Sequence, residues 1–264
     1  MNGRQSTFVV FQSACAAGLL LLCSACATPV SPALLRKAET HRSLADLKLQ
    51  KGHLPFAIRE YRASIAIYAE SAEAHFGLGE AYRRKAMLDA AEKEFLEAIR
   101  IDPAHQDAQL NLGVVYMQSE RWGQAIEINT HLIESHVFLA PQRALVNRGW
   151  AFYKSGDLAG AEIDFREVLG SYGSDPRAHL NLGIVLYDRG ETLEAMGHFE
   201  SAAAESSNAQ QIVMPIETHA RFLLAQAHVK LGQRDKAIAQ FKVASEGGNS
   251  EWARKSREYL SVLE

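Results

Sequence analysis

The chain has 264 residues, of which 47% are hydrophobic and 22% are charged, and its formal net charge is −3. This composition is typical of a folded globular chain, and it gives no basic surplus with which to bind nucleic acid. All three cysteines, Cys15, Cys23 and Cys26, lie in the first 26 residues. The rest of the chain can therefore contain neither a disulfide framework nor a cysteine-based metal site.

Residues 1–25 have the pattern of a secretory signal peptide. Arg4 precedes an apolar run over residues 14–22, and two small residues, Ser24 and Ala25, precede Cys26. The apolar run is too short for a membrane-spanning helix. The segment resembles a bacterial lipobox, in which Cys26 is acylated, although Cys23 stands where leucine is usual. The alternative is an ordinary secreted or single-anchor protein.

Acylation of Cys26 would attach the protein to a membrane without a transmembrane helix, because two or three acyl chains such as palmitate anchor a protein stably. By resemblance to other lipoproteins, Ala27 at the second mature position implies an outer-membrane location, facing the periplasm. Residues 26–37 are then expected to form a lipidated, extended tether, since Pro29 and Pro32 favour extended chain.

From Ala38 onward the chain repeats with a period of 34 residues. One column of small residues is filled in all six copies, by Ala45, Gly79, Gly113, Gly149, Gly183 and Ala225. A second follows twelve residues later, at Ala57, Ala91, Ala125, Ala161, Ala195 and Ala237. Four residues further on stand Tyr61, Phe95, Asn129, Phe165, Phe199 and Phe241. Small residues let two antiparallel helices approach closely, and the large residue fills the gap between one helix pair and the next.

These columns are similar to the tetratricopeptide repeat (TPR) signature. The resemblance implies an all-α, right-handed solenoid of six helix-turn-helix repeats. The predicted repeats are 38–71, 72–105, 106–139, 142–175, 176–209 and 218–251. Residues 252–264 place Trp252, Tyr259, Leu260 and Leu263 at helical spacing, which predicts the capping helix that a solenoid needs at its end.

In the TPR pattern the first helix of each repeat, helix A, lines a concave face. The residues predicted to form a partner-binding groove are Phe76, Leu110, Asn111, Val114, Met117, Val146, Asn147, Trp150, Tyr153, Leu180, Asn181, Ile184 and Tyr187. So large an apolar surface facing water indicates a docking site for an apolar segment of a partner protein, with Trp150 as its principal anchor. The alternative is that Leu110, Leu180 and the tyrosines are packing residues partly covered by the next repeat.

Two polar columns share this face. Asn111, Asn147 and Asn181 occupy one position in successive repeats; resemblance to peptide-binding TPRs implies a ladder that hydrogen-bonds a ligand backbone, while the alternative is that Asn is common there. The basic residues of the same face are Arg83, Arg84, Arg143, Lys154 and Arg177. They form either a clamp for acidic groups or an ordinary solvated surface.

Catalytic motifs are missing from the sequence. It has no phosphate-binding loop and no nucleophile elbow, and His131 and His136 are spaced so that they do not share a helix face. We therefore predict a protein that is not an enzyme and has no cofactor, no metal and no small-molecule substrate.

A lipobox followed by six TPRs and a capping helix resembles the type IV pilus biogenesis lipoproteins, the secretin pilotins of the PilF/PilW/Tgl kind. The segments that carry the resemblance are 78–84, 110–116 and 147–162. It implies an outer-membrane lipoprotein that binds secretin subunits and promotes their localisation and multimer assembly. The alternative function is a periplasmic TPR adaptor lipoprotein that recruits cell-envelope enzymes.

Overall fold

The computed structural model describes residues 30–135, 138–208 and 214–263, and within these ranges the chain forms thirteen helices and no strand. The predicted all-α fold class is therefore confirmed. The signal peptide and the lipidation site Cys26 lie outside the described residues, so both stay predictions.

Twelve of the helices form six antiparallel pairs, each an A helix followed by a B helix. The pairs are α1 (Pro32–Gln50) with α2 (Leu54–Ile67), α3 (Ala72–Arg84) with α4 (Leu88–Ile101), α5 (Gln106–Gln118) with α6 (Trp122–Glu134), α7 (Pro141–Ser155) with α8 (Leu158–Ser171), α9 (Pro176–Asp188) with α10 (Thr192–Asn208), and α11 (Met214–Lys230) with α12 (Arg234–Ser245). Helix α13 (Glu251–Leu263) follows the last pair.

Helix α1 begins earlier than the first predicted repeat. The side chain of Ser31 accepts a hydrogen bond from the backbone N–H of Leu34, and Pro32 occupies the first helical position. A serine N-cap followed by proline is a strong helix start. The ring of proline fixes φ at a helical value, and the backbone N–H that proline lacks has no partner within the helix at this position. Residues 32–37, expected to be part of the extended tether, are therefore helical.

Within a repeat the two helices meet where an aromatic ring of helix B lies on a glycine of helix A. Phe95, Phe165 and Phe199 are 0% exposed. A Cβ atom added to Gly79, Gly149 or Gly183 would lie 2.7, 2.8 or 2.6 Å from the corresponding ring. The small-residue column and the aromatic column are thus the two sides of one contact, which sets how closely the helices of a pair approach.

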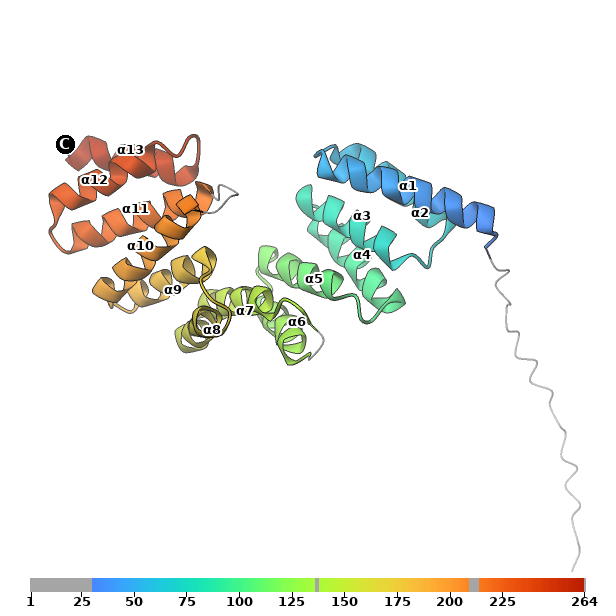
Figure 1. Cartoon of the computed structure of the whole chain (residues 1–264), viewed down its shortest axis with the longest axis horizontal. Helices are drawn as coiled ribbons and strands as arrows, with labels where there is room; N and C mark the ends of the chain where they lie inside the picture. Colours follow the sequence, from blue (N-terminus) through green and yellow to red (C-terminus); the bar gives the residue numbers. More distant parts are fainter. Residues whose placement is uncertain (1–29, 136–137, 209–213, 264) are drawn as a thin grey trace, which may run out of the picture.

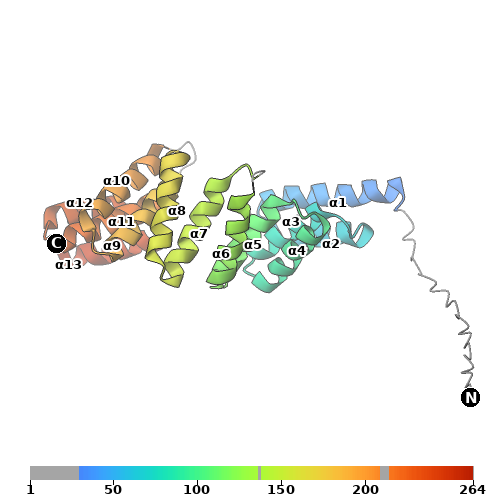
Figure 2. The same ribbon diagram turned by 90° about the horizontal axis from the view of Figure 1, so that it is seen from below.

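The stacked pairs form an arch. Neighbouring A helices contact one another, from α1 and α3 to α9 and α11, whereas successive B helices make no such contact in the described part of the chain. Figure 1 shows α1 and α13 at the two ends of the arch and α7 and α8 at its middle. In the view from below, the pairs follow the chain order along the long axis (Figure 2). The A helices therefore lie on the inner side of the curve.

The glycine contact predicts opposite effects for two glycine-to-alanine substitutions. Gly149→Ala places a methyl group against the buried ring of Phe165 and should lower the free energy of unfolding by about 1–2 kcal/mol, as overpacking does. Gly197→Ala, in α10 with nothing near its Cβ position, should raise it by up to about 1 kcal/mol through helix propensity. Urea unfolding of both variants tests this. Equal effects would mean that the ring does not fix the helix spacing.

Candidate protein-binding groove

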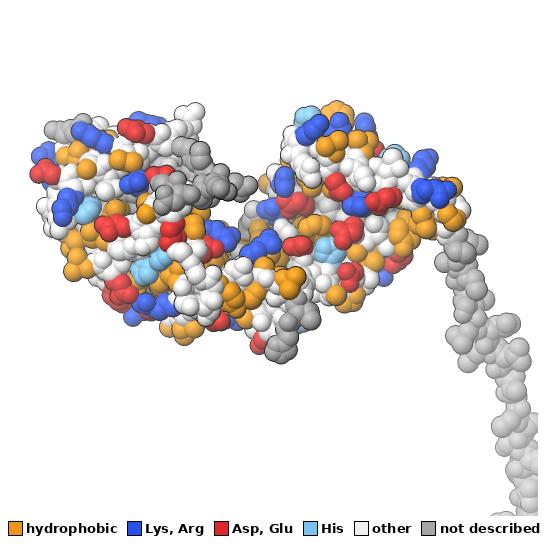
Figure 3. All heavy atoms as spheres, in the orientation of Figure 1, with side chains coloured by type: hydrophobic (Ala, Val, Ile, Leu, Met, Phe, Trp, Pro, Cys, Tyr) orange, Lys and Arg blue, Asp and Glu red, His pale blue; other side chains and the backbone are white. Residues whose placement is uncertain are grey.

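The arch encloses a hollow between the limb that carries α1 to α4 and the limb that carries α9 to α13 (Figure 3). We call the half-buried residues of the A helices on this side the inner groove. Its members are Phe76, Asn111, Val114, Met117, Asn147, Trp150, Tyr153, Asn181, Ile184 and Tyr187. Ten of the thirteen predicted groove residues therefore retain some exposure.

Leu110, Val146 and Leu180 do not belong to this surface. They are only 2%, 5% and 7% exposed. Leu110 packs in a cluster with Ala144, and Val146 packs in another with Ala178, so in each case the partner lies on the A helix of the following repeat. For these leucines the packing alternative is correct, and Val146, predicted to be exposed, is buried for the same reason.

Aromatic rings and lysines alternate along the C-terminal half of the inner groove. The rings of Trp150 and Tyr153 lie 5.2 Å apart. The Nζ atom of Lys154 is 5.9 Å from the centroids of both Trp122 and Trp150. We call Trp150, Tyr153 and Tyr187 the aromatic row. A cation near a ring face is attracted by the ring quadrupole, so the lysine is held over the groove.

The next repeat continues the same arrangement. Lys230 places its Nζ atom 4.5 Å from the centroid of Tyr187. The two residues line a cavity of about 190 Å³ together with Gln226, Val229 and Tyr259. The C-terminal end of the groove therefore offers an apolar wall with a positive charge beside it, a combination suited to an amphipathic segment that carries acidic groups.

A hydrogen bond crosses between two repeats inside the groove. The Tyr153 hydroxyl of α7 donates to the Asp188 carboxylate of α9 over 2.7 Å. Burial, reinforced by this hydrogen bond and by the charge of Asp188, raises the pKa of Tyr153 to about 12. The hydroxyl is therefore protonated at neutral pH and holds the ring in place in the aromatic row.

The asparagine column and the basic residues of this face differ in how many of them already bind groups of the chain itself. Asn111 donates its side-chain amide to the backbone oxygen of Asp107, 2.9 Å away in its own helix, while Asn147 and Asn181 are half-buried. The asparagine ladder stays a prediction. The four arginines of the expected clamp bind carboxylates of the chain: Arg83 and Arg84 bind Glu80, Arg143 binds Asp107, and Arg177 binds Asp175. These ion pairs favour the solvated-surface alternative for the arginines. Lys154, by contrast, forms no ion pair with a carboxylate in the described part of the chain and lies beside the Trp150 ring.

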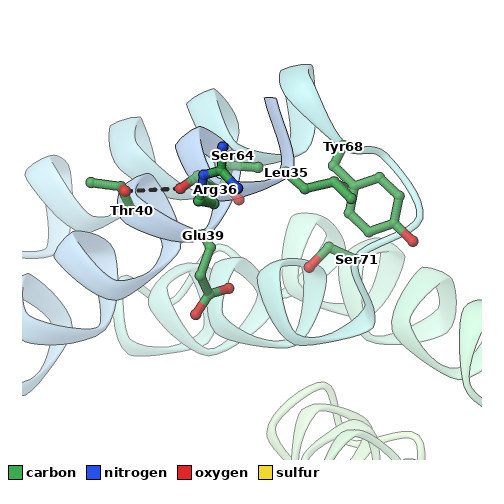
Figure 4. Close-up of a pocket in the computed structure, with 8 residues that line it drawn as sticks. Leu35, Arg36, Glu39, Thr40, Ser64, Tyr68 and Ser71 are labelled. Carbon is green, nitrogen blue, oxygen red and sulfur yellow. Dashed lines mark hydrogen bonds between the residues drawn. The ribbon is translucent and has the colours of Figure 1, made fainter. Parts of the chain in front are cut away.

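Outside the groove, a hollow of about 540 Å³ lies between the first half of α1, the end of α2 and Ser71 at the start of α3 (Figure 4). Its lining includes Tyr68, Ser64 and Leu35 with one carboxylate, that of Glu39. Within the described ranges no group of three His, Cys, Asp or Glu side chains is placed to hold a metal ion. None of the described helices is long and apolar enough to cross a membrane.

The Tyr153–Asp188 bond predicts a coupled effect on stability. Tyr153→Phe and Asp188→Ala should each lower the free energy of unfolding by about 1 kcal/mol, and the double variant should lose little more, because both changes remove one interaction. Tyr172→Phe, at an exposed tyrosine at the end of α8, should be neutral. Urea unfolding of the four variants measures the coupling, and additive losses would show that the two side chains act separately.

Several solved structures share this fold along most of the chain. PilF of Pseudomonas aeruginosa has a TM-score of 0.67 at 18% identity, with 86% of this chain and 99% of that chain covered. PilW, described as a widely conserved type IV pilus biogenesis factor, has a TM-score of 0.71 at 17% identity, with 83% and 97% covered. A tetratricopeptide repeat protein of Parabacteroides merdae gives 0.66, at 15% identity and coverages of 86% and 84%. At these identities the likeness concerns the fold.

The family assignment rests on the sequence itself. Residues 42–105, 87–134, 112–176 and 146–210 match one tetratricopeptide repeat profile, and residues 218–244 match a second. No curated protein matches the chain. The matched segments span well over half of the sequence and coincide with the paired helices and their small and aromatic columns. The chain therefore belongs to the tetratricopeptide repeat family, whose members are typically scaffolds for protein interactions.

Proposed function

We propose that this protein is an outer-membrane lipoprotein that binds secretin subunits in its inner groove and promotes their localisation and multimer assembly for type IV pilus biogenesis. The observation that carries protein binding is the aromatic row, which stays half-exposed at the middle of the arch with lysines beside it. The pilus assignment is supported by the likeness to PilF and PilW, which extends over 97–99% of those chains.

The arrangement suits an escort for a subunit that has not yet assembled. A subunit of a membrane pore carries apolar segments that need cover until they reach lipid, and a helix-lined groove with aromatic walls can bury one of them. An acylated Cys26 confines the complex to the layer next to the bilayer. Binding and insertion then occur at a raised effective concentration, without any additional contact.

Removal of the lipidation site tests the anchor. Cys26→Ala should release the protein into the soluble periplasmic fraction when the membranes are washed with high salt, because the acyl chains supply the stable attachment and salt screens any electrostatic contact with lipid headgroups. The measurement is fractionation of cells that carry the wild-type or variant gene. A variant that remains wholly with the outer membrane would contradict an anchor at Cys26.

Truncation of one ring tests the groove. Trp150→Ala should weaken binding of the secretin subunit about thirtyfold, because a buried tryptophan at an interface contributes about 2 kcal/mol or more. Ile163→Ala removes an apolar side chain that is 65% exposed on α8 and should leave affinity unchanged. Titration of labelled subunit gives both values, and thermal unfolding checks that each variant is folded. Wild-type affinity of Trp150→Ala would place the binding site elsewhere.

Deletion of the gene tests the function as a whole. Secretin subunits should still be made, but they should not form outer-membrane multimers, and surface pili should be lost. The heat- and detergent-resistant secretin band on a gel is the measurement. A band of wild-type intensity together with altered cell-wall turnover would instead favour the adaptor that recruits cell-envelope enzymes.

A further inference from the structure

The first A helix exposes positions that the other repeats bury. In α3, α5, α7, α9 and α11 two columns of helix A are covered by the preceding repeat and are 0% exposed: Ala74, Ala108, Ala144, Ala178 and Ala220, and Ala81, Val115, Ala151, Val185 and Ala227. A third column holds Leu78, Leu112, Leu182 and Leu224, each at most 2% exposed, with Arg148 in the fourth repeat. The α1 residues at these positions are Thr40, Leu47 and Leu44.

Leu44 and Leu47 are 39% and 44% exposed. With Lys37, Thr40 and Lys51, the C-cap residue of α1, they recur every three or four residues, so they follow one side of the helix to its C-terminal end. We call these five residues the outer α1 stripe. The outer α1 stripe is apolar at its centre and has a lysine at each end.

The charges around the outer α1 stripe are all positive. Arg36 and Lys48 flank it, and neither they nor the two stripe lysines pair with a carboxylate among the described residues. The acidic residues of α1, Glu39 and Asp46, bind Arg42 instead. Figure 4 shows Glu39 and Thr40 leaving the helix in different directions. No carboxylate of α1 therefore offsets the charge of the stripe.

The whole first helix pair differs in charge from the rest of the protein. Residues 30–67 contain seven Lys or Arg and three Asp or Glu, a net charge of +4. Residues 68–264 contain 20 Lys or Arg and 28 Asp or Glu, a net charge of −8. Arg4 accounts for the remaining +1 in the net charge of −3. Hydrophobic and basic side chains lie next to each other at this end of the arch (Figure 3). Such a surface complements an anionic, partly apolar partner.

We propose that the outer α1 stripe lies on an anionic lipid surface, with its lysines at the phosphate groups and its leucines in the boundary between headgroups and acyl chains. Helices that rest in a membrane interface combine these two features. The inference relies on the membrane location of the proposed function, but not on the secretin. Cys26 precedes Pro32 by six residues, a length of chain that spans at most about 20 Å, so an anchored protein would hold α1 next to the bilayer.

The side chains of the stripe are better suited to contact with lipid than to packing against another helix. The position of Leu47 is Ala or Val in all five covered repeats, and that of Thr40 is Ala in all five, because a helix of the preceding repeat approaches closely there. The larger Leu47 and the Thr40 hydroxyl would hold such a helix away, whereas a fluid lipid surface adapts to them. Thr40 donates its hydroxyl to the backbone oxygen of Arg36 over 2.8 Å (Figure 4), so contact with lipid leaves this donor paired.

The other end of the arch has a different character. Helix α13 covers the last pair and buries its own Ala253 and Ser256. Its charged residues form mixed pairs along the helix, such as Lys255 with Glu251 and Arg254 with Glu258. Contact through α1 would therefore orient the arch with one end on the membrane and the inner groove open to a partner.

Vesicle binding tests this orientation. The protein from residue 27 onward, which contains every described residue, is sedimented with vesicles of phosphatidylcholine alone or mixed with phosphatidylglycerol. We expect binding to the mixed vesicles only, weakened by salt. Lys37→Gln combined with Lys51→Gln should lower the partition coefficient about 25-fold, since each cation near an anionic surface contributes about fivefold. Lys93→Gln combined with Lys236→Gln removes the same charge from exposed positions of α4 and α12 and should leave binding unchanged.

Two outcomes would overturn the inference: no binding of the wild-type protein to the mixed vesicles, or equal loss of binding in the stripe variant and its control. Circular dichroism of each variant separates lost binding from lost folding. The result is independent of the secretin. If gene deletion abolishes secretin multimers but the protein does not bind vesicles, the proposed function stands and the lipid contact is wrong. If the protein binds vesicles but multimers form normally in the deletion strain, the lipid contact stands and the proposed function is wrong.

Discussion

The architecture depends on one contact, in which an aromatic ring of helix B lies on the backbone of a small residue in helix A. Phe165 on Gly149 shows its geometry: the ring is fully buried, and a methyl group on the glycine would lie 2.8 Å from it. The contact fixes the spacing within a pair, and its repetition brings neighbouring A helices together while the B helices stay apart. That difference curves the stack and produces the inner groove.

The third repeat lacks the ring and shows what replaces it. Asn129 is 0% exposed, and its amide donates to the backbone oxygen of Ala125 over 2.7 Å. The other side-chain atom, Oδ1, has no hydrogen-bond partner among the described residues. A Cβ atom on Gly113 would lie 2.9 Å from the Asn129 amide nitrogen. The helices therefore keep their close approach, but the repeat exchanges apolar packing for a buried polar group that is only partly satisfied.

The inner groove and the outer α1 stripe, the two surfaces that we assign to function, use different positions of the repeat unit. The inner groove uses A-helix positions that neighbours cover only in part, and the centre of the outer α1 stripe, Thr40, Leu44 and Leu47, uses positions that are covered in the other repeats. The aromatic row suits a protein segment because its rings are held in place by the core and by Asp188. The stripe suits lipid because its side chains are larger than a stacked helix allows. Separate surfaces would let the protein rest on a membrane while its groove remains accessible.

The periodic columns of the sequence determined the helix pairs, because small residues at fixed spacing let two antiparallel helices approach closely. They misplaced the aromatic ring, which was predicted between one pair and the next and lies within a pair, on the small residue of helix A. Ten of the residues predicted for the groove, Trp150 among them, are half-buried, and their role in binding a partner stays a prediction. The burial of Leu110 and Val146 was decided by the tertiary structure, since each packs in a cluster with an alanine of the next repeat; Leu180 is buried in a cluster that joins side chains of several repeats. The tertiary structure also decided the ion pairs of Arg83 and Arg84 with Glu80, because they depend on the directions in which these side chains leave the helix. The exposure of Leu44 and Leu47 follows from position in the stack, because in a solenoid each repeat is covered only by its neighbours, and α1 has a neighbour on one side alone within the described chain.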